Sequence, residues 1–227
     1  MTSIPTSLQT VPTPRTRLVD VPRPALVALL GWVALALASA ASGLLDAAPP
    51  LIGLLFAVAV GGTLIAWRRS PTLRAWTQGL DLRVPIALHV ARFGFGTMFL
   101  VELAAGHLPA TFAERGGYGD ILAGALAILA IVLVGSPGRH GRQPASDLGR
   151  AAAWTFSVVG LADILLVFGT GQYLVFVAHD PLVVGAIGRL PYALLPTLVV
   201  PLVVLTHVLV MQRLRAARHG AAAGAFT

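Results

Sequence analysis

Residues 25–45 read ALVALLGWVALALASAASGLL and contain no charged side chain. As an α-helix this stretch is about 30 Å long, which matches the hydrocarbon core of a bilayer. Asp46 and the pair Pro49-Pro50 follow it directly and indicate a tight turn. The stretch therefore predicts a membrane-spanning helix that ends at a turn.

Five further apolar runs follow along the chain, at 51–67, 84–106, 121–135, 151–169 and 190–211. Of the 227 residues, 56% are hydrophobic and 11% are charged, whereas a soluble domain has about 25% charged residues. We therefore expect an all-α fold, a polytopic bundle of six transmembrane helices. Pro191, Pro196 and Pro201 predict a kink in the sixth helix, because a proline inside a helix removes a backbone hydrogen bond.

The segments between the apolar runs are polar or mixed. Residues 1–24 predict a disordered tail, 25–212 the transmembrane domain and 213–227 a second tail. The segment 70–83 predicts a short amphipathic helix at the membrane interface. A loop is expected at 107–119, where Thr111 and Glu114 fit a capping box that would begin a short helix. A polar loop is expected at 136–150 and a surface segment at 170–189.

Arginine supplies all sixteen basic residues other than histidine, and its distribution indicates the orientation. If the six runs span the membrane, thirteen arginines fall on one side and only Arg115 and Arg189 on the other. Loops rich in arginine stay in the cytoplasm, so both termini are predicted to be cytoplasmic. The thirteen are Arg15, Arg17, Arg23, Arg68, Arg69, Arg74, Arg83, Arg139, Arg142, Arg150, Arg213, Arg215 and Arg218.

Composition also narrows the function. The net charge of +7 does not indicate a nucleic-acid partner, because the arginines flank apolar runs as membrane topology requires. The chain has no cysteine, which excludes disulfides and thiolate metal sites. No phosphate loop, HExxH element, Gly-x-Ser-x-Gly element or other catalytic arrangement is present. We predict no metal site, and the sequence indicates no enzyme chemistry.

Three polar residues are predicted at one level in the cytoplasmic half of the bundle, namely His89, Arg92 and His207. Two histidines at one depth could be the axial ligands of a haem, with Arg92 beside a propionate, or could surround a quinone head group. Alternatively, the histidines hydrogen-bond between helices and Arg92 pairs with a buried acid, and this structural interpretation is the one we favour. In each case we expect all three to face the bundle interior.

Three carboxylates, Glu102, Asp120 and Asp163, are predicted in the outer half. They could bind a cation or relay protons, because an ionisable group inside a membrane usually serves function. In the structural alternative Asp120 is the N-cap of the fourth helix, and Glu102 or Asp163 pairs with an arginine. Asp163 lies inside the fifth run and must meet a donor, for which Arg92 is one candidate.

The motif that begins Leu108-Pro109-Ala110-x-Phe112-Ala113 continues as Gly117-x-Gly119-Asp120-Ile121-Leu122-x-Gly124. It resembles the LPAxFAxxxGxGDILVG pattern of a widespread family of uncharacterised bacterial integral membrane proteins. The elements Gly160-x-x-Asp163 and Leu190-Pro191-x-x-Leu194-Leu195-Pro196, with His207 beyond, are similar too. The resemblance covers about 84–212 and departs at Ala123, where valine is usual. It implies a membrane fold and draws attention to Asp120, Asp163 and His207, but implies no activity.

Together these patterns predict a multi-pass protein of the bacterial cytoplasmic (inner) membrane, with the lipid bilayer as its surroundings. The leading functional hypothesis is a polar core that binds a small ligand or ion, as in a transporter or a sensor. The second is a haem- or quinone-linked redox protein, and the third is an accessory subunit without a ligand. The sequence does not define a cofactor or an oligomeric state.

Overall fold

The computed structural model describes residues 21–135 and 146–224. Within these ranges every regular element is helical, and six helices are long and apolar enough to cross a membrane. Their order along the chain follows the six predicted runs. The predicted tail at 1–24 lies outside the described residues except at its end, where Arg23 begins the first helix. The loop arginines Arg139 and Arg142 lie outside them as well.

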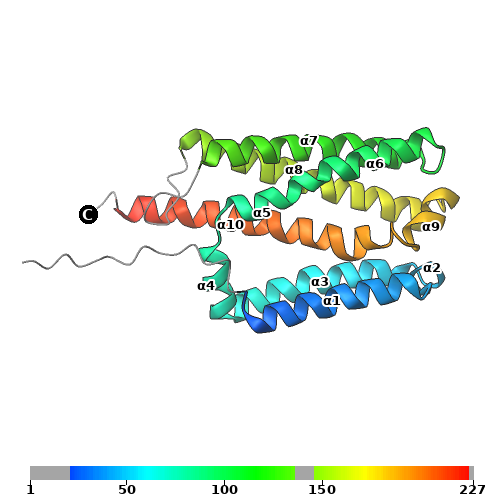
Figure 1. Cartoon of the computed structure of the whole chain (residues 1–227), viewed down its shortest axis with the longest axis horizontal. Coiled ribbons are helices and arrows are strands. Elements are labelled where there is room, and N and C mark those ends of the chain that lie inside the picture. The colour runs from blue at the N-terminus through cyan, green and yellow to red at the C-terminus, as the bar shows by residue number, and fades with distance from the viewer. Residues whose placement is uncertain (1–20, 136–145, 225–227) are drawn as a thin grey trace, which may run out of the picture.

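Six long helical spans are joined by short connecting helices (Figure 1). The long spans are α1 (Arg23–Ala41), α3 (Pro50–Arg69), α5 (Arg83–Ala87) with the 3-10 turn η1 (Leu88–Ala91) and α6 (Arg92–Ala104), α7 (Ala110–Val134), α8 (Asp147–Phe176), and the π-helical segment η2 (Leu195–Val199) with α10 (Val200–Gly224). The connecting helices are α2 (Leu44–Ala47), α4 (Pro71–Gly79) and α9 (Pro181–Ile187). Helix α4 is the short helix predicted within 70–83, and the Ser70 side chain caps it by accepting from the Leu73 N–H.

The fourth span begins earlier than predicted. We expected a loop at 107–119 and a capping box formed by Thr111 and Glu114. Instead α7 is continuous from Ala110, and its N-cap residue Pro109 makes no side-chain cap hydrogen bond. Gly116, Gly117 and Gly119 lie inside this helix. Side chains of neighbouring helices pack directly against them, and this packing stabilises the helix despite the glycines.

The fifth span is also longer than predicted at both ends. The Ser146 side chain accepts from the Gly149 N–H and caps α8, which then continues to Phe176. The predicted loop at 136–150 is therefore helical from Asp147 onward, and the predicted surface segment at 170–189 is divided between α8 and α9. Because α8 is longer at its far end, Asp163 lies near the middle of the helix.

Helices α6, α7 and α8 pack closely because glycines leave room at their contacts. A Cβ on Gly96 of α6 would lie 2.5 Å from the Gly117 carbonyl oxygen of α7, and one on Gly149 of α8 would lie 2.5 Å from the Leu133 carbonyl oxygen. Neither distance is possible for a real side chain, so these backbones touch. Close backbone approach at small residues is a usual way for helices to associate in lipid.

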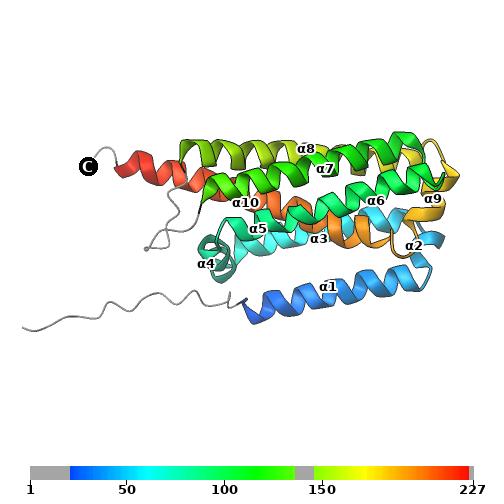
Figure 2. The same ribbon diagram turned by 45° about the horizontal axis from the view of Figure 1, so that its top comes forward.

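Helices α1 and α3, here called the outer helices, lie on one side of α10 (Figures 1 and 2). The buried residues of α1 are Ala36, Ser39 and Ala40, and those of α3 are Ile52 and Ala59. Most of their apolar surface is exposed, as expected for helices that face lipid.

The predicted kink of the last span is present as the π-helical segment η2, which lies between Pro191 and Pro201. Pro201 has no N–H to donate to the Thr197 carbonyl one turn earlier. That carbonyl instead accepts from the Trp32 indole N–H of α1, at 2.9 Å. A backbone group freed by proline thus connects an outer helix to the rest of the bundle.

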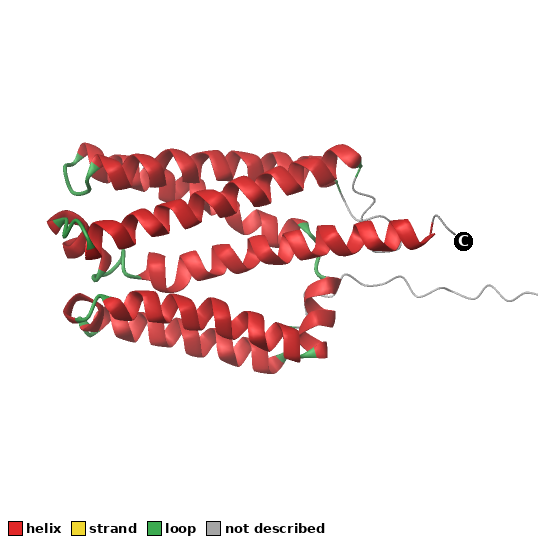
Figure 3. Ribbon diagram, turned by 180° about the vertical axis from the view of Figure 1, so that it is seen from behind, coloured by secondary structure: helices red, strands yellow, loops and turns green. Residues whose placement is uncertain are grey.

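Eight of the described arginines gather at one end of the bundle, whereas Arg189 lies at the other end, where it pairs with Asp46. At the first end lie the start of α1, helix α4, the start of α8 and the far part of α10, which projects past the other helices (Figure 3). We call this the arginine-rich end. The arginines concerned are Arg23, Arg68, Arg69, Arg74, Arg83, Arg150, Arg213 and Arg215. Helices α2 and α9 lie at the opposite end (Figure 1).

Candidate functional site

Arg92 is the centre of a buried ion cluster. It is the first residue of α6, directly after η1, and only 1% of it is exposed. Its Nε donates to Asp120 Oδ1 of α7 at 2.5 Å, and its Nη2 donates to Asp163 Oδ2 of α8. Its Nη1 donates to the Gly160 carbonyl oxygen at 3.2 Å. We call Arg92, Asp120 and Asp163 the ion cluster, and it joins three helices through charge-assisted hydrogen bonds.

Two glycines make the space that the ion cluster occupies. A Cβ on Gly119 would lie 1.8 Å from Asp163 Oδ1. A Cβ on Gly160 would lie 2.6 Å from His207 Cε1 and 3.4 Å from Arg92 Nη1. Any larger side chain at either position would collide with the cluster or with His207.

His89 and His207 are fully buried beside the ion cluster, as predicted. Their ring centroids are 4.1 Å apart, and the Phe156 ring packs against both. His89 Nε2 is 2.9 Å from Thr206 Oγ1. The Thr206 hydroxyl lies within hydrogen-bond distance of the Leu202 carbonyl oxygen. If it donates there, His89 Nε2–H is the donor to threonine and His89 Nδ1 carries a free lone pair.

Several buried atoms in this region have no hydrogen-bond partner among the described residues. They are His89 Nδ1, both ring nitrogens of His207, and the hydroxyl of Ser157, which lies one turn before Gly160 on α8. Buried polar atoms are nearly always hydrogen-bonded to protein or to ordered water. These atoms can therefore form hydrogen bonds with a water molecule or a ligand that enters the region.

The two histidines do not fit the haem hypothesis. Axial ligands hold an iron between their nitrogens, with the porphyrin plane separating the two rings. Here the rings are in van der Waals contact, so no porphyrin fits between them. Within the described residues no group of three or more histidine, aspartate or glutamate side chains could hold a metal ion.

The predicted division into two levels is wrong for two of the three carboxylates. Asp120 is not an N-cap, because α7 begins at Ala110 and Asp120 lies inside it, hydrogen-bonded to Arg92. Asp163 reaches the same level and meets Arg92, one of the donors expected for it. The structure thus brings His89, Arg92, Asp120, Asp163 and His207 together.

Glu102 lies apart from the ion cluster, toward the end of α6. It does not pair with any of the arginines considered, but with His107 Nδ1 at 2.8 Å and with the Tyr192 hydroxyl, which donates to it. Desolvation, followed by this hydrogen bond to Glu102, raises the pKa of Tyr192 to about 12. Tyr192 is therefore a neutral donor at physiological pH.

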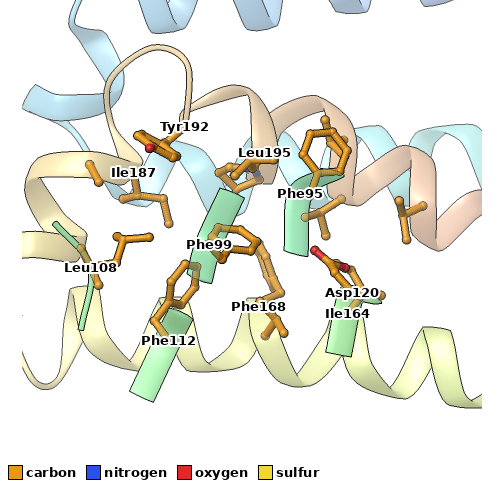
Figure 4. A pocket seen from close by; sticks show the side chains of 18 of the residues that line it. Phe95, Phe99, Leu108, Phe112, Asp120, Ile164, Phe168, Ile187, Tyr192 and Leu195 are labelled. Atoms are coloured by element: carbon orange, nitrogen blue, oxygen red, sulfur yellow. The ribbon is translucent and has the colours of Figure 1, made fainter. Parts of the chain in front are cut away.

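A cavity of about 60 Å³ lies between the ion cluster and the α2–α9 end. Figure 4 shows Asp120 near one end of it and Leu108 and Ile187 near the other, with phenylalanine rings between them. The wall is almost entirely apolar, and its aromatic members are Phe95, Phe99, Phe112, Phe168 and Tyr192. Its polar members include Arg92, Asp120 and Gln172. An apolar cavity with a few convergent polar groups is the usual form of a small-molecule site.

Sequence reasoning missed the glycines, Thr206 and the phenylalanines of the cavity. The glycines carried a usable signal, because Gly119 directly precedes Asp120 and Gly160 lies one turn before Asp163. A glycine within one turn of a buried acid leaves room for other members of the same buried cluster, as Gly119 does for Asp163 and Gly160 for His207. The phenylalanines carried no such signal, because apolar residues are expected throughout a membrane helix.

The described part of the chain is all-helical and has six potential membrane spans, with a buried arginine and two aspartates among them. This is the composition of a multi-pass membrane protein. Residues 49–215 match the model of a family described as Domain of unknown function (DUF8737). Because the match covers more than half of the chain, the protein belongs to this family. The matched residues include the whole ion cluster and all residues that line the cavity, but not α1. No curated protein and no solved structure matches the chain.

Proposed function

We propose that this protein is a multi-pass protein of the bacterial cytoplasmic membrane with both termini in the cytoplasm. The six apolar helices support this, as does the gathering of eight described arginines at one end, because arginine-rich loops remain cytoplasmic. The resemblance to bacterial integral membrane proteins points the same way. Reporter fusions within 107–109 and 178–180 should be active outside, and fusions within 70–82 and at the C-terminus should be active inside. A C-terminus found outside would contradict the proposal.

We further propose that the cavity binds a small ligand, as in a transporter or a sensor. The observation that carries this is the apolar cavity with Arg92 and Asp120 in its wall. Burial of an apolar group there is favourable, and the two charged residues can orient a polar end of the ligand. The ligand class is therefore a small, largely apolar molecule with one polar group. A quinone ring has this chemistry too, which keeps the redox hypothesis as one outcome of the test.

The test is identification of the molecule that stays bound. The full chain is extracted into lipid nanodiscs, and native mass spectrometry detects what it retains. Val203 lines the cavity and is buried, whereas its neighbour Leu202 is exposed. Val203→Phe puts a ring into the cavity and should lower the retained amount at least about tenfold, equivalent to about 1.4 kcal/mol. Leu202→Phe is the matched control and should leave retention unchanged.

Each outcome has a defined meaning. A retained molecule that Val203→Phe displaces supports the cavity as its site, and a reducible quinone among the retained molecules would select the redox hypothesis. A wild-type protein that retains only bulk lipid, in the same amount as Val203→Phe, would contradict ligand binding in the cavity.

A further inference from the structure

The ion cluster has an excess of one negative charge if both aspartates are ionised, because Arg92 supplies a single positive charge to two carboxylates. All three side chains are largely buried, with 2%, 7% and 15% of the side chains of Arg92, Asp120 and Asp163 exposed. A buried charge without a partner costs several kcal/mol, so something must balance it.

Among the described residues, no other charged side chain near the cluster supplies that balance. The titratable and charged residues that face it are His89 of η1, His207 of α10 and the three members themselves. The next cation along α7, Arg115, donates instead to the Thr170 hydroxyl at 3.0 Å. From α3 and α9, the other elements near the cavity, no charged residue lies at this level.

His207 lies beside the cluster but does not supply the balancing charge. Its ring is fully buried, neither nitrogen has a partner among the described residues, and its Cε1–Nε2 edge packs on Gly160 beside Arg92 Nη1. A protonated imidazole there would lie beside the guanidinium without an acceptor, so the resting ring is neutral. It is a free base in contact with the cluster.

We propose that the ion cluster is a proton-binding site. It holds one proton on the Asp120–Asp163 pair, with the unpartnered ring of His207 beside Arg92. With one carboxyl protonated, the remaining carboxylate matches Arg92 and the cluster is neutral. The proton belongs to the coupled pair rather than to one residue. This inference does not depend on ligand binding in the cavity.

Access to this proton is unequal from the two ends of the bundle. Toward the arginine-rich end lie the His89–Thr206 contact and then a cluster of buried apolar side chains, which includes Ile86, Ala130 and Val210. Toward the α2–α9 end lies the cavity, whose wall includes Asp120. In this conformation the proton therefore exchanges through the cavity, as expected for one of two alternating states of a proton-coupled transporter.

The experiment is infrared spectroscopy of the full chain reconstituted in phosphatidylcholine vesicles at neutral pH. A protonated carboxyl gives a carbonyl band that ionised carboxylates lack, and labelling with ¹³C-aspartate shifts that band whereas ¹³C-glutamate does not. The wild type should show one such aspartate band. Asp120→Asn and Asp163→Asn should each abolish it, because the single remaining carboxylate is matched by Arg92. Glu102→Gln, outside the cluster, should leave it unchanged.

Three results would overturn the proposal. One is the absence of an aspartate band from the wild type, which needs no variant and applies even if the asparagine variants do not fold. Another is a band that persists in both variants. The third is a band present in potassium salt but lost in sodium salt, which would make the balancing group a metal cation.

Discussion

Helices α6, α7 and α8 differ from the outer helices α1 and α3 in how they are held in the bundle. In the most apolar stretch of α7, 39% of residues are buried, against 11% in α3. A Cβ added at Gly96, Gly117 or Gly119 would lie within 3 Å of a neighbouring helix, whereas one added at Gly61 or Gly62 of α3 would meet nothing within 4 Å. In the proposed membrane, lipid competes equally for apolar surface, so close packing and polar contacts would hold the first group together.

The outer helices depend on a few contacts at defined points. The Phe56 ring of α3 stacks on Phe168 of α8 with centroids 4.3 Å apart, Trp32 bonds to Thr197, and Asp46 pairs with Arg189. The comparison indicates that substitutions in the ion cluster should cost much more stability than substitutions of similar size at the outer helices.

The largest expected effect follows removal of the central cation. Arg92→Leu leaves the Asp120–Asp163 pair buried without its cation and should lower the free energy of unfolding by about 3–5 kcal/mol. Thermal unfolding of the detergent-solubilised protein measures this. Arg115→Leu is the control, because within the described part of the chain Arg115 donates to a threonine hydroxyl and to no carboxylate. Equal melting temperatures for the two variants would show that the cluster does not hold α6, α7 and α8 together.

The glycines should give effects of opposite sign in the two regions. Gly119→Ala puts a methyl group 1.8 Å from Asp163 Oδ1 and should cost about 1–3 kcal/mol through overpacking. Gly62→Ala meets open space and should be neutral or stabilise α3 by up to about 1 kcal/mol, because alanine favours the helix. The same unfolding measurement compares them, and a destabilised Gly62→Ala would contradict the exposed position of α3.

A smaller effect is expected where α1 meets η2. Trp32→Phe removes the donor to the Thr197 carbonyl and should cost about 1 kcal/mol. Trp76→Phe in α4 is a matched control, because the Trp76 indole nitrogen is buried without a partner among the described residues. Unfolding midpoints should therefore fall for the first variant and stay level or rise for the second. The reverse order would remove Trp32 as the anchor of α1.

The smallest effect is expected at the ion pair of Arg189 with Asp46. Arg189 Nη2 lies 2.9 Å from Asp46 Oδ2, and 68% of the Arg189 side chain is exposed. Asp46→Ala should change the free energy of unfolding by no more than about 1 kcal/mol, and less in high salt. A loss as large as that of Arg92→Leu would mean that the connection between α2 and α9 holds the outer helices far more strongly than its exposure indicates.

The six spans could be predicted from the sequence, because the length and hydropathy of each apolar run follow directly from its residues. The sequence was insufficient for their ends. Ala110 and Asp147 both begin helices inside segments that were expected to be loops. In the first segment Gly116 and Gly117 weaken helix propensity, and packing against α6 offsets this. The error carried over to Asp120, which seemed to open a helix and in fact lies well inside one.

The candidate site shows the same pattern. All six candidate residues were chosen because ionisable groups in apolar runs need partners, and five of them meet. Arg92 was one of the donors expected for Asp163, whereas its pairing with Asp120 was not expected, because Asp120 was predicted at the start of a helix and at another depth. The contact between His89 and His207 and the shape of the cavity depend on helix rotation, which an apolar sequence specifies weakly.

The order of the cluster residues along the chain has a consequence for biogenesis. Arg92 is made 28 residues before Asp120 and 71 residues before Asp163. At about 5–20 residues per second, Asp163 follows Arg92 by roughly 4–14 s. Until the end of that interval the third span carries a guanidinium whose partners have not both been synthesised, and its release into lipid is costly. We therefore expect the insertion machinery to retain this span until the fifth has emerged, and to release the three helices together.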